Sequence, residues 1–406
     1  MLNTKYLIIG GGLAGAYASI SIRERDKNGR IILISEENYL PYDRVPLSKT
    51  YLQGLIKKDL IFIKDEKFYK DNNIELFLNK KVEKIDFDNN IAFLKDNEEI
   101  EYEKVLLATG GYPRKLKVEG SEAENIFYLR TIDDCDKIKS LINKIKKAVI
   151  IGGGFIGCEI ASSFKKYNIK TTIIEKESYL LPLTLDEISG KIITEHFIKN
   201  GIYVLTNTSV NKIITKNGKA IGVETSDGRE VEADIIIIGI GIIPNTSLAE
   251  NKIKTNNGIV TNEFLRTKKE NVFAAGDVAN FYHSLFNENI RVEHYDVAVK
   301  HGKIAGMNMT GENRKFDELP YFFSYMYKLN IYSWGYMKGY DTIIRRGELN
   351  IEKGFLQFYL SKGKIKAVLA VNTLKEVEEA KKLIMQKEFD NPEILSNLNI
   401  SLKDLS

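Results

Sequence analysis

The chain has 406 residues, a formal net charge of +4, 43% hydrophobic residues and 28% charged residues. One compact core cannot accommodate this length, so we expect two or three domains. The composition is that of an ordinary globular protein. The mild positive charge gives no reason to expect a nucleic-acid partner, although it would suit a small acidic protein partner.

The cysteines and the hydropathy of the sequence indicate the cellular compartment in which the protein is expected. Cys135 and Cys158 are the only two cysteines, and they provide neither a disulfide framework nor metal-ligand spacing, so we expect a reducing cytoplasm. The first apolar run begins almost at Met1, so we expect no signal peptide. The longest apolar run, 235–243, is too short to cross a bilayer and predicts a buried parallel strand instead. We therefore expect no membrane association.

The first expected element is a strand that ends in a glycine-rich turn. The apolar run 6–9 is followed by Gly-x-Gly-x-x-Gly at 10–15. In such a turn the first glycine permits the bend, the second lets a pyrophosphate approach the backbone, and the third lets helix and strand pack closely. A second strand, 30–35, precedes Glu36, where a ribose-binding carboxylate is expected. This segment predicts a dinucleotide site.

A loop with two prolines follows at 41–49, with the sequence Pro-Tyr-Asp-Arg-Val-Pro-Leu-Ser-Lys. Proline fixes φ, so this loop is stiff enough to hold Arg44 and Lys49 in place. The alternative is an ordinary surface loop with solvated charges. Short strands are expected over 59–105, and 105–110 predicts a buried strand that ends in small residues, where ligands bind in open α/β sheets.

Residues 148–175 repeat the opening pattern. An apolar run precedes Gly-x-Gly-x-x-Gly at 152–157, and a later strand ends at Glu175. Two complete units in one chain predict two dinucleotides. A carboxylate at the strand tip favours a ribose 2′-OH over a 2′-phosphate, and hence NADH over NADPH, although Lys176 beside it weakens this inference.

The remaining segments close these units and add a third region. Val272–Asp277 places small residues before Asp277, which suits a bound polyol or ribose, and an amphipathic helix is expected at 297–309. The last ~90 residues differ in character, as a separate domain would. There we expect aromatic-rich strands at 321–336 and 341–347 and further strands at 355–360 and 365–371. A helix is expected to follow at 374–386.

In the order and spacing of these motifs the chain resembles the FAD-dependent pyridine nucleotide-disulfide oxidoreductase superfamily. Within it, the chain is similar to the subgroup without a redox disulfide, which includes ferredoxin, rubredoxin and putidaredoxin reductases and apoptosis-inducing factor. The marker of this subgroup is Pro-x-x-Arg-x-Pro-Leu-Ser-Lys at 41–49, where disulfide reductases carry a cysteine pair. The other matching stretches are 10–15, 108–110, 128–131, 152–159, 239–245, 274–277 and 291–294.

The resemblance implies an α/β fold with two Rossmann-like dinucleotide-binding domains (the glutathione-reductase fold) and a small α+β C-terminal domain. The FAD-binding domain would be discontinuous, at 1–112 and 244–317. The NADH-binding domain would span 113–243 and the C-terminal domain 318–406.

The resemblance also implies roles for individual residues. Lys49 would lie beside flavin N5, and Glu159 would pair with Lys49 and contact the nicotinamide, so these two are the candidate catalytic residues. The other FAD-binding residues would be Gly10, Gly12, Leu13, Ala14, Gly15, Glu36, Arg44, Val82, Ala108, Thr109, Gly110, Arg130, Gly276, Asp277, Glu293, His294, Tyr295 and Phe323. NADH would be bound by Gly152, Gly154, Phe155, Ile156, Gly157, Glu159, Glu175, Gly239, Ile240 and Gly241.

The implied function is an NADH:ferredoxin or rubredoxin reductase, in which FAD passes electrons from NADH to a small acidic iron–sulfur carrier. An NADH oxidase that produces hydrogen peroxide and an NADH-responsive redox sensor are the alternatives. The sequence leaves the oligomeric state open and shows no metal-ligand spacing among its histidines. It also favours core filling over redox chemistry for Cys158.

One stretch departs from the family pattern. The C-terminal domain of the family begins Pro-x-Phe-Trp-Ser-Asp-Gln, whereas this chain has Pro-Tyr-Phe-Phe-Ser-Tyr-Met at 320–326. Tyr325 and Met326 replace polar residues, which puts the usual ferredoxin contact in doubt. Positive charge, including that of Arg345 and Arg346, predicts a docking patch for an acidic carrier, and the alternative for this arginine pair is a solvated face.

Overall fold

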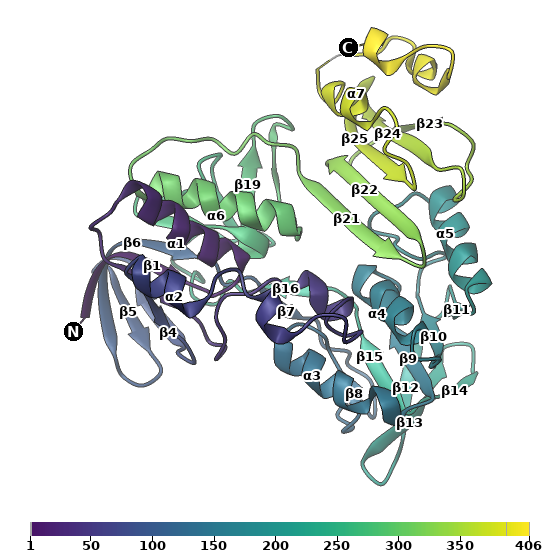
Figure 1. Cartoon of the computed structure of the whole chain (residues 1–406), viewed down its shortest axis with the longest axis horizontal. Coiled ribbons are helices and arrows are strands. Elements are labelled where there is room, and N and C mark those ends of the chain that lie inside the picture. The colour runs from purple at the N-terminus through teal and green to yellow at the C-terminus, as the bar shows by residue number, and fades with distance from the viewer. Residues whose placement is uncertain (1, 387, 406) are drawn as a thin grey trace. The chain divides into compact units, whose positions relative to one another are not determined.

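The structure, a computed structural model, describes residues 2–386 and 388–405 and divides the chain into two compact units (Figure 1). Unit 1 holds the chain up to Asp43, then Asp59–Tyr112 and Ile243–Phe322. Unit 2 holds Arg44–Lys58, Pro113–Ile242 and the chain from Phe323 onward. The loop that carries Arg44 and Lys49 therefore belongs to unit 2.

Unit 1 is built on one mixed sheet with the strand order β3-β2-β1-β6-β5-β4, in which β18 also pairs with β6. The segments β1, β2, β3 and β18 run parallel to their neighbours. The apolar residues of β2 and β18 are buried on both faces, as is usual in parallel sheets. The long strand β6 pairs with β5 through its first residues and with β18 through its last. The strands are β1 (Leu2–Ile9), β2 (Ile31–Ile34), β3 (Ile74–Phe77), β4 (Val82–Asp86), β5 (Ile91–Leu94), β6 (Glu99–Leu107) and β18 (Val272–Ala274).

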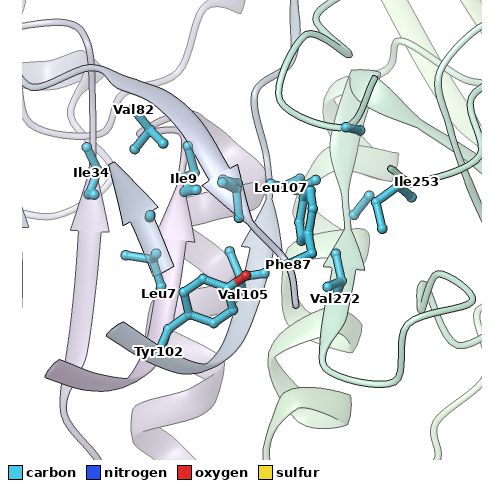
Figure 2. Packing of buried hydrophobic residues seen from close by; sticks show 14 of the residues in the cluster. Leu7, Ile9, Ile34, Val82, Phe87, Tyr102, Val105, Leu107, Ile253 and Val272 are labelled. Atoms are coloured by element: carbon cyan, nitrogen blue, oxygen red, sulfur yellow. The ribbon is translucent and has the colours of Figure 1, made fainter. Parts of the chain in front are cut away.

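The hydrophobic core of unit 1 joins segments that are far apart in the sequence. Leu7 and Leu107 of the sheet share one buried cluster with Val272 and Ile253. Figure 2 shows the ring of Phe87 lying among these side chains. This packing fixes the ends of the central strands, on which the site is built.

Two helices of unit 1, α1 (Leu13–Arg25) and α6 (Tyr295–Met309), lie side by side (Figure 1). Glycine makes this contact close, since a Cβ added at Gly302 would lie 2.4 Å from the carbonyl oxygen of Ala14. Helix α6 begins two residues before the predicted start. The unit also contains α2 (Glu66–Asp71) and a small sheet of β17 (Ile259–Thr261), β19 (Ala279–His283) and β20 (Glu288–Ile290).

Unit 2 contains a second parallel sheet, with the order β11-β10-β9-β15-β8. The apolar run that predicted a buried parallel strand forms β15, which is shorter than the run. The strands are β8 (Ile126–Phe127), β9 (Lys147–Ile151), β10 (Lys170–Ile174), β11 (Tyr203–Leu205) and β15 (Ile235–Ile238), and the helices are α3 (Ile132–Leu141), α4 (Phe155–Lys165) and α5 (Glu187–Lys199). An antiparallel sheet adds β12 (Val210–Lys216), β13 (Lys219–Thr225) and β14 (Glu230–Glu232).

The C-terminal region forms an antiparallel sheet in the order β21-β22-β25-β24-β23. The predicted aromatic strand 321–336 is in fact two strands, because Tyr327 and Lys328 adopt φ values of +48° and +63° and turn the chain. The strands are β21 (Tyr321–Met326), β22 (Leu329–Gly335), β23 (Thr342–Arg346), β24 (Phe355–Ser361) and β25 (Lys364–Val371).

The predicted helix at 374–386 is shorter in the structure, where α7 spans only Val377–Lys382. Glu376 has a φ of +57° and Met385 a φ of +59°, and a right-handed helix cannot pass through either residue. The α/β fold class is confirmed, and the three domain boundaries stay a prediction. Within the described residues, no helix is both long and apolar enough to cross a membrane.

Candidate functional site

The two glycine-rich turns have the same internal packing. Gly10 and Gly152 adopt φ values of +121° and +105°, which favour glycine. A Cβ added at Gly15 would lie 2.0 Å from the carbonyl oxygen of Gly10, and one added at Gly157 would lie 2.1 Å from that of Gly152. The first and third glycines of each motif are therefore required by the fold itself.

The middle glycines are not required by packing. A Cβ added at Gly12 or Gly154 would meet no heavy atom within 4 Å. These glycines are the N-caps of α1 and α4, and neither helix has a side-chain cap or an acidic residue in its first turn. By contrast, Thr131 and Asp186 cap α3 and α5. Two helix N-termini thus keep unsatisfied N–H groups beside open space, an arrangement that fits the pyrophosphates of two dinucleotides.

The acidic residues after the second strands lie in different environments. Glu175 is 6% exposed, and its carboxylate accepts hydrogen bonds from the Gly153 N–H at 2.6 Å and the Glu177 N–H at 2.9 Å. The side chain of Glu36 is 68% exposed and forms an ion pair with Lys81 at 2.9 Å. Both carboxylates follow the second strand of their unit, the position at which a ribose-binding carboxylate was predicted.

Other predicted FAD-binding residues of unit 1 gather at the carboxyl edge of its sheet. Ala108, Thr109 and Gly110 follow β6, while Gly276 and Asp277 follow β18, whose Ala274 pairs with Leu107. Leu13 and Ala14 open α1 at the same edge. Val82 starts β4, and its side chain is buried in the core, so only its backbone is available to a ligand.

Helix α6 supplies a third N-terminus without a side-chain cap. Its N-cap residue is His294, whose Nδ1 atom is buried and has no hydrogen-bond partner among the described residues. Burial lowers the pKa of His294 to about 4, so the ring is neutral at pH 7. Burial also raises the pKa of Tyr295 to about 12. Glu293 forms an ion pair with Arg291 at 2.6 Å.

In unit 2 the structure brings Lys49 and Glu159 together. The Lys49 Nζ lies 2.9 Å from the Glu159 Oε1, and both side chains are largely buried. The ammonium group also lies 5.7 Å from the ring centroid of Phe323, within reach of a cation–π interaction. Two hydroxyls complete the cluster, since the Ser48 Oγ donates to the Glu159 Oε2 at 2.5 Å and the Ser324 Oγ donates to the Oε1 at 2.6 Å.

Sequence reasoning did not assign a role to Ser48 or Ser324. The signal available was their placement, since one serine precedes Lys49 and the other follows Phe323 directly. Neither position shows by itself that its hydroxyl reaches Glu159 on α4. That contact depends on tertiary packing of three segments.

The remaining predicted residues of unit 2 surround its glycine turn or the Lys49 loop. The Arg44 guanidinium donates to the Arg130 carbonyl at 2.7 Å. Gly239, Ile240 and Gly241 follow β15, which pairs with the strand that precedes the glycine turn, and Gly241 has a φ of +92°. Phe155 and Ile156 open α4 beside the open Gly154.

The predicted docking patch at Arg345 and Arg346 is wrong, and so is the solvated face that was its alternative. Arg345 forms an ion pair with Asp186 at 2.5 Å. Arg346 is only 4% exposed, because its guanidinium binds Glu376 and the carbonyl oxygens of three residues, Leu395, Asn397 and Ile400. Arg345 thus ties the C-terminal sheet to the N-cap of α5, and Arg346 holds the C-terminal region together.

The two residues that replace polar ones of the family pattern, Tyr325 and Met326, differ in exposure. Tyr325 is 46% exposed, whereas Met326 is 2% exposed and belongs to the interior. These neighbours point to opposite faces of β21, as the two-residue period of a strand requires. Only Tyr325 of the two is available to a partner.

Both cysteines and two of the four histidines are core residues. Cys135 and Cys158 are free and buried, and burial raises the pKa of Cys135 to about 12 and that of Cys158 well above its ordinary value. Core filling is thus confirmed for Cys158. His283 and His301 are buried as well. The part of the chain that the structure describes contains no group of three or more His, Cys, Asp and Glu side chains that could hold a metal ion.

Comparison with known proteins agrees with this geometry. The chain matches the family "Pyridine nucleotide-disulphide oxidoreductase" over residues 4–302 and the family "Reductase C-terminal" over residues 321–406. It is 31% identical to putidaredoxin reductase CamA of Pseudomonas putida over 411 residues, which covers 99% of this chain and 97% of the relative. It is 31% identical to rubredoxin-NAD(+) reductase of Pseudomonas putida over 339 residues, covering 83% of this chain and 88% of the relative.

Solved structures show the same likeness. The ferredoxin reductase for the CYP199A2 system from Rhodopseudomonas palustris matches with a TM-score of 0.93 and 29% identity, over 99% of this chain and 100% of that structure. The reductase of a covalent putidaredoxin reductase–putidaredoxin complex matches with a TM-score of 0.94 and 30% identity, over 100% of this chain and 98% of that structure.

Proposed function

Since the chain belongs to the pyridine nucleotide-disulphide oxidoreductase family, we propose that it passes electrons from NADH through FAD to a small iron–sulfur carrier such as a ferredoxin or rubredoxin. The chain is an FAD-dependent oxidoreductase, and FAD and NADH are its cofactors. The observation that carries the proposal is the pair of uncapped helix N-termini beside Gly12 and Gly154, together with a buried Lys49–Glu159 pair. Relatives named for putidaredoxin and rubredoxin support the class of acceptor.

When bound, FAD would supply the redox chemistry: it can take one hydride, which is two electrons and one proton, from NADH and give the two electrons up one at a time. The protein supplies binding and electrostatics. The N–H groups at Gly12 and Gly154 hold the two pyrophosphates, and Glu175 accepts the hydrogen bond of the NADH ribose. By family resemblance, we assign Lys49 to the flavin, where its positive charge stabilises the negative charge that reduction adds.

We further propose that Glu159 keeps this lysine in place and orients the nicotinamide. The buried pair needs several hydrogen bonds to remain charged, and Ser48 and Ser324 supply two of them. Electrons leave from the flavin itself, because both cysteines are free and their thiols resist ionisation. The cytoplasm is the proposed compartment, since a reducing environment maintains free cysteines.

Steady-state assays with a defined acceptor test the proposal. With NADH, the purified protein should reduce cytochrome c rapidly only when a ferredoxin or rubredoxin is added. Oxygen consumption without the carrier should be slow. Rapid oxygen consumption with formation of hydrogen peroxide would instead identify an NADH oxidase, and slow reoxidation by both acceptors would identify a redox sensor.

A further inference from the structure

The carboxylate of Glu159 is held by side chains from two other segments of unit 2. Ser48 comes from the loop at 44–58, and Ser324 lies on β21 of the C-terminal sheet. Ser324 shares the Oε1 with Lys49, while Ser48 takes the Oε2. Both serines are buried, so their hydroxyls are shielded from solvent.

The backbone that carries Ser48 is itself tied to α4. The Ser163 Oγ donates to the Ser48 carbonyl oxygen at 2.7 Å and accepts from the Gln53 Nε2 at 3.0 Å. Because Ser163 follows Glu159 by one turn of the same helix, the hydroxyl and its acceptor are fixed to one another. The Ser48 backbone is therefore held against α4 independently of the position of the Lys49 side chain.

These contacts have a consequence for the lysine. A carboxylate with Lys49 as its sole partner would turn to bind the ammonium group with both oxygens and would hold it tightly. With both oxygens already occupied by hydroxyls, Glu159 keeps its orientation and stays solvated by the protein without Lys49. Glu159 then positions the ammonium group, whose positive charge can still stabilise negative charge that develops on the flavin.

We propose that Ser48 and Ser324 are positioning residues for flavin reduction, which act through Glu159 by fixing its carboxylate so that the charge of Lys49 serves the cofactor. This inference rests on the proposed function. The opposing explanation is that the two hydroxyls only satisfy buried polar groups and contribute to stability. A structural role of that kind does not depend on Lys49.

A double-mutant cycle separates the two explanations. The variants are Ser48→Ala with Ser324→Ala, Lys49→Met, and the three substitutions together. Two quantities are measured: the limiting rate of flavin bleaching by NADH in a stopped-flow instrument, and the midpoint potential of the bound FAD. FAD content and thermal unfolding show whether each variant folds.

Removal of both hydroxyls should lower the limiting rate about tenfold, because a displaced charge stabilises the transition state less well. It should also disfavour the reduced cofactor about tenfold, which for a two-electron couple is a fall of about 30 mV in the potential. In the Lys49→Met background the same serine substitutions should change neither quantity. Ser324→Thr keeps a hydroxyl on a strand and should behave as the wild type.

Ser333→Ala is the matched control, since Ser333 is a buried serine of the same sheet whose Oγ contacts the Met337 Sδ instead. It should leave the rate and the potential unchanged. If serine removal has the same effect with and without Lys49, or has no effect on either quantity, the positioning role is overturned. If the double alanine variant does not retain FAD, Ser324→Ala alone gives the same comparison. A wild-type flavin that NADH does not bleach would instead refute the proposed function, and the inference with it.

Discussion

The glycine turn of unit 1 and that of unit 2 have nearly the same backbone but different carboxylates. A Cβ added to the third glycine would lie 2.0 Å from the carbonyl oxygen of the first glycine in unit 1 and 2.1 Å from it in unit 2. The middle glycine faces open space in both turns. Glu175, however, is buried and already accepts two backbone N–H groups, whereas Glu36 is exposed beside Lys81. Packing fixes the turn in both units, whereas the two carboxylates lie in different environments.

This difference has a cause in the chain that follows each strand. Glu175 directly follows Ile174, the last residue of β10, while Ser35 directly follows Ile34, the last residue of β2. The acid of unit 1 therefore comes one residue later, and successive residues of an extended chain point in opposite directions. The carboxylate of unit 2 is therefore preorganised by backbone N–H groups, and that of unit 1 is not.

The largest expected effect distinguishes packing glycines from open ones. Gly157→Ala should destabilise the protein by about 3 kcal/mol, because its Cβ has no room beside the Gly152 carbonyl oxygen. Gly154→Ala should leave the free energy of unfolding within about 0.5 kcal/mol of wild type. Urea unfolding measures both, and equal losses of stability would show that the middle glycine is also a packing residue.

The stability of the two units should also differ in its pH dependence, which is a smaller effect. Burial lowers the pKa of His301 to about 3 and that of His294 to about 4, from an ordinary 6.5, and both lie in unit 1. The unfolded chain binds protons on these rings at a pH where the folded chain does not. The contribution of the two neutral histidines to the free energy of unfolding is therefore fully present above pH 6.5. It is lost as the pH falls from 6.5 toward the folded-state pKa of each ring, and His301 alone accounts for a loss of about 2 kcal/mol at pH 5.

Amide hydrogen exchange, corrected for intrinsic rates, is the measurement for this pH effect. Between pH 7 and pH 5, protection of β1 and β6 should fall, while protection of β9 and β10 should change less. An equal fall in both units would mean that the buried histidines do not make unit 1 the more acid-sensitive part.

The preorganised carboxylate predicts a specificity change of about 1–3 kcal/mol. Glu175→Ala should narrow the preference for NADH over NADPH by that amount, because a charge-assisted hydrogen bond to the ribose 2′-OH is lost. The ratio of kcat/KM values for the two nucleotides reports it. Glu36→Ala is the matched control and should leave the ratio unchanged; a wild-type preference for NADPH would refute the role of Glu175.

The sequence predicted what local rules determine. Both glycine turns follow from the conformational freedom and small size of glycine, and the buried strands follow from runs of isoleucine and leucine. The environment of Arg346 could not be predicted, because its partners are Glu376 and carbonyl groups some 50 residues further along the chain. In the sequence alone, a positive charge near an aromatic strand is consistent with a docking patch, because the partners that bury Arg346 are not visible.

Ser48 and Ser324 were missed for the same reason. Each hydroxyl reaches Glu159 across more than 100 residues of sequence, at separations of 111 and 165. The short helix α7 was misjudged because Glu376 adopts a left-handed conformation, with its side chain bound to Arg346. In each case a tertiary contact overrode the local pattern.

We expect the first glycine turn to hold FAD and the second to hold NADH. Anaerobic titration of the purified protein with NADH tests it most directly when Gly12→Ala and Gly154→Ala are compared with wild type. The wild-type protein should contain one FAD per chain and be bleached by one equivalent of NADH. Gly12→Ala should lose FAD, and Gly154→Ala should retain FAD but require at least tenfold more NADH for bleaching. Loss of FAD from Gly154→Ala, with Gly12→Ala unaffected, would contradict the claim.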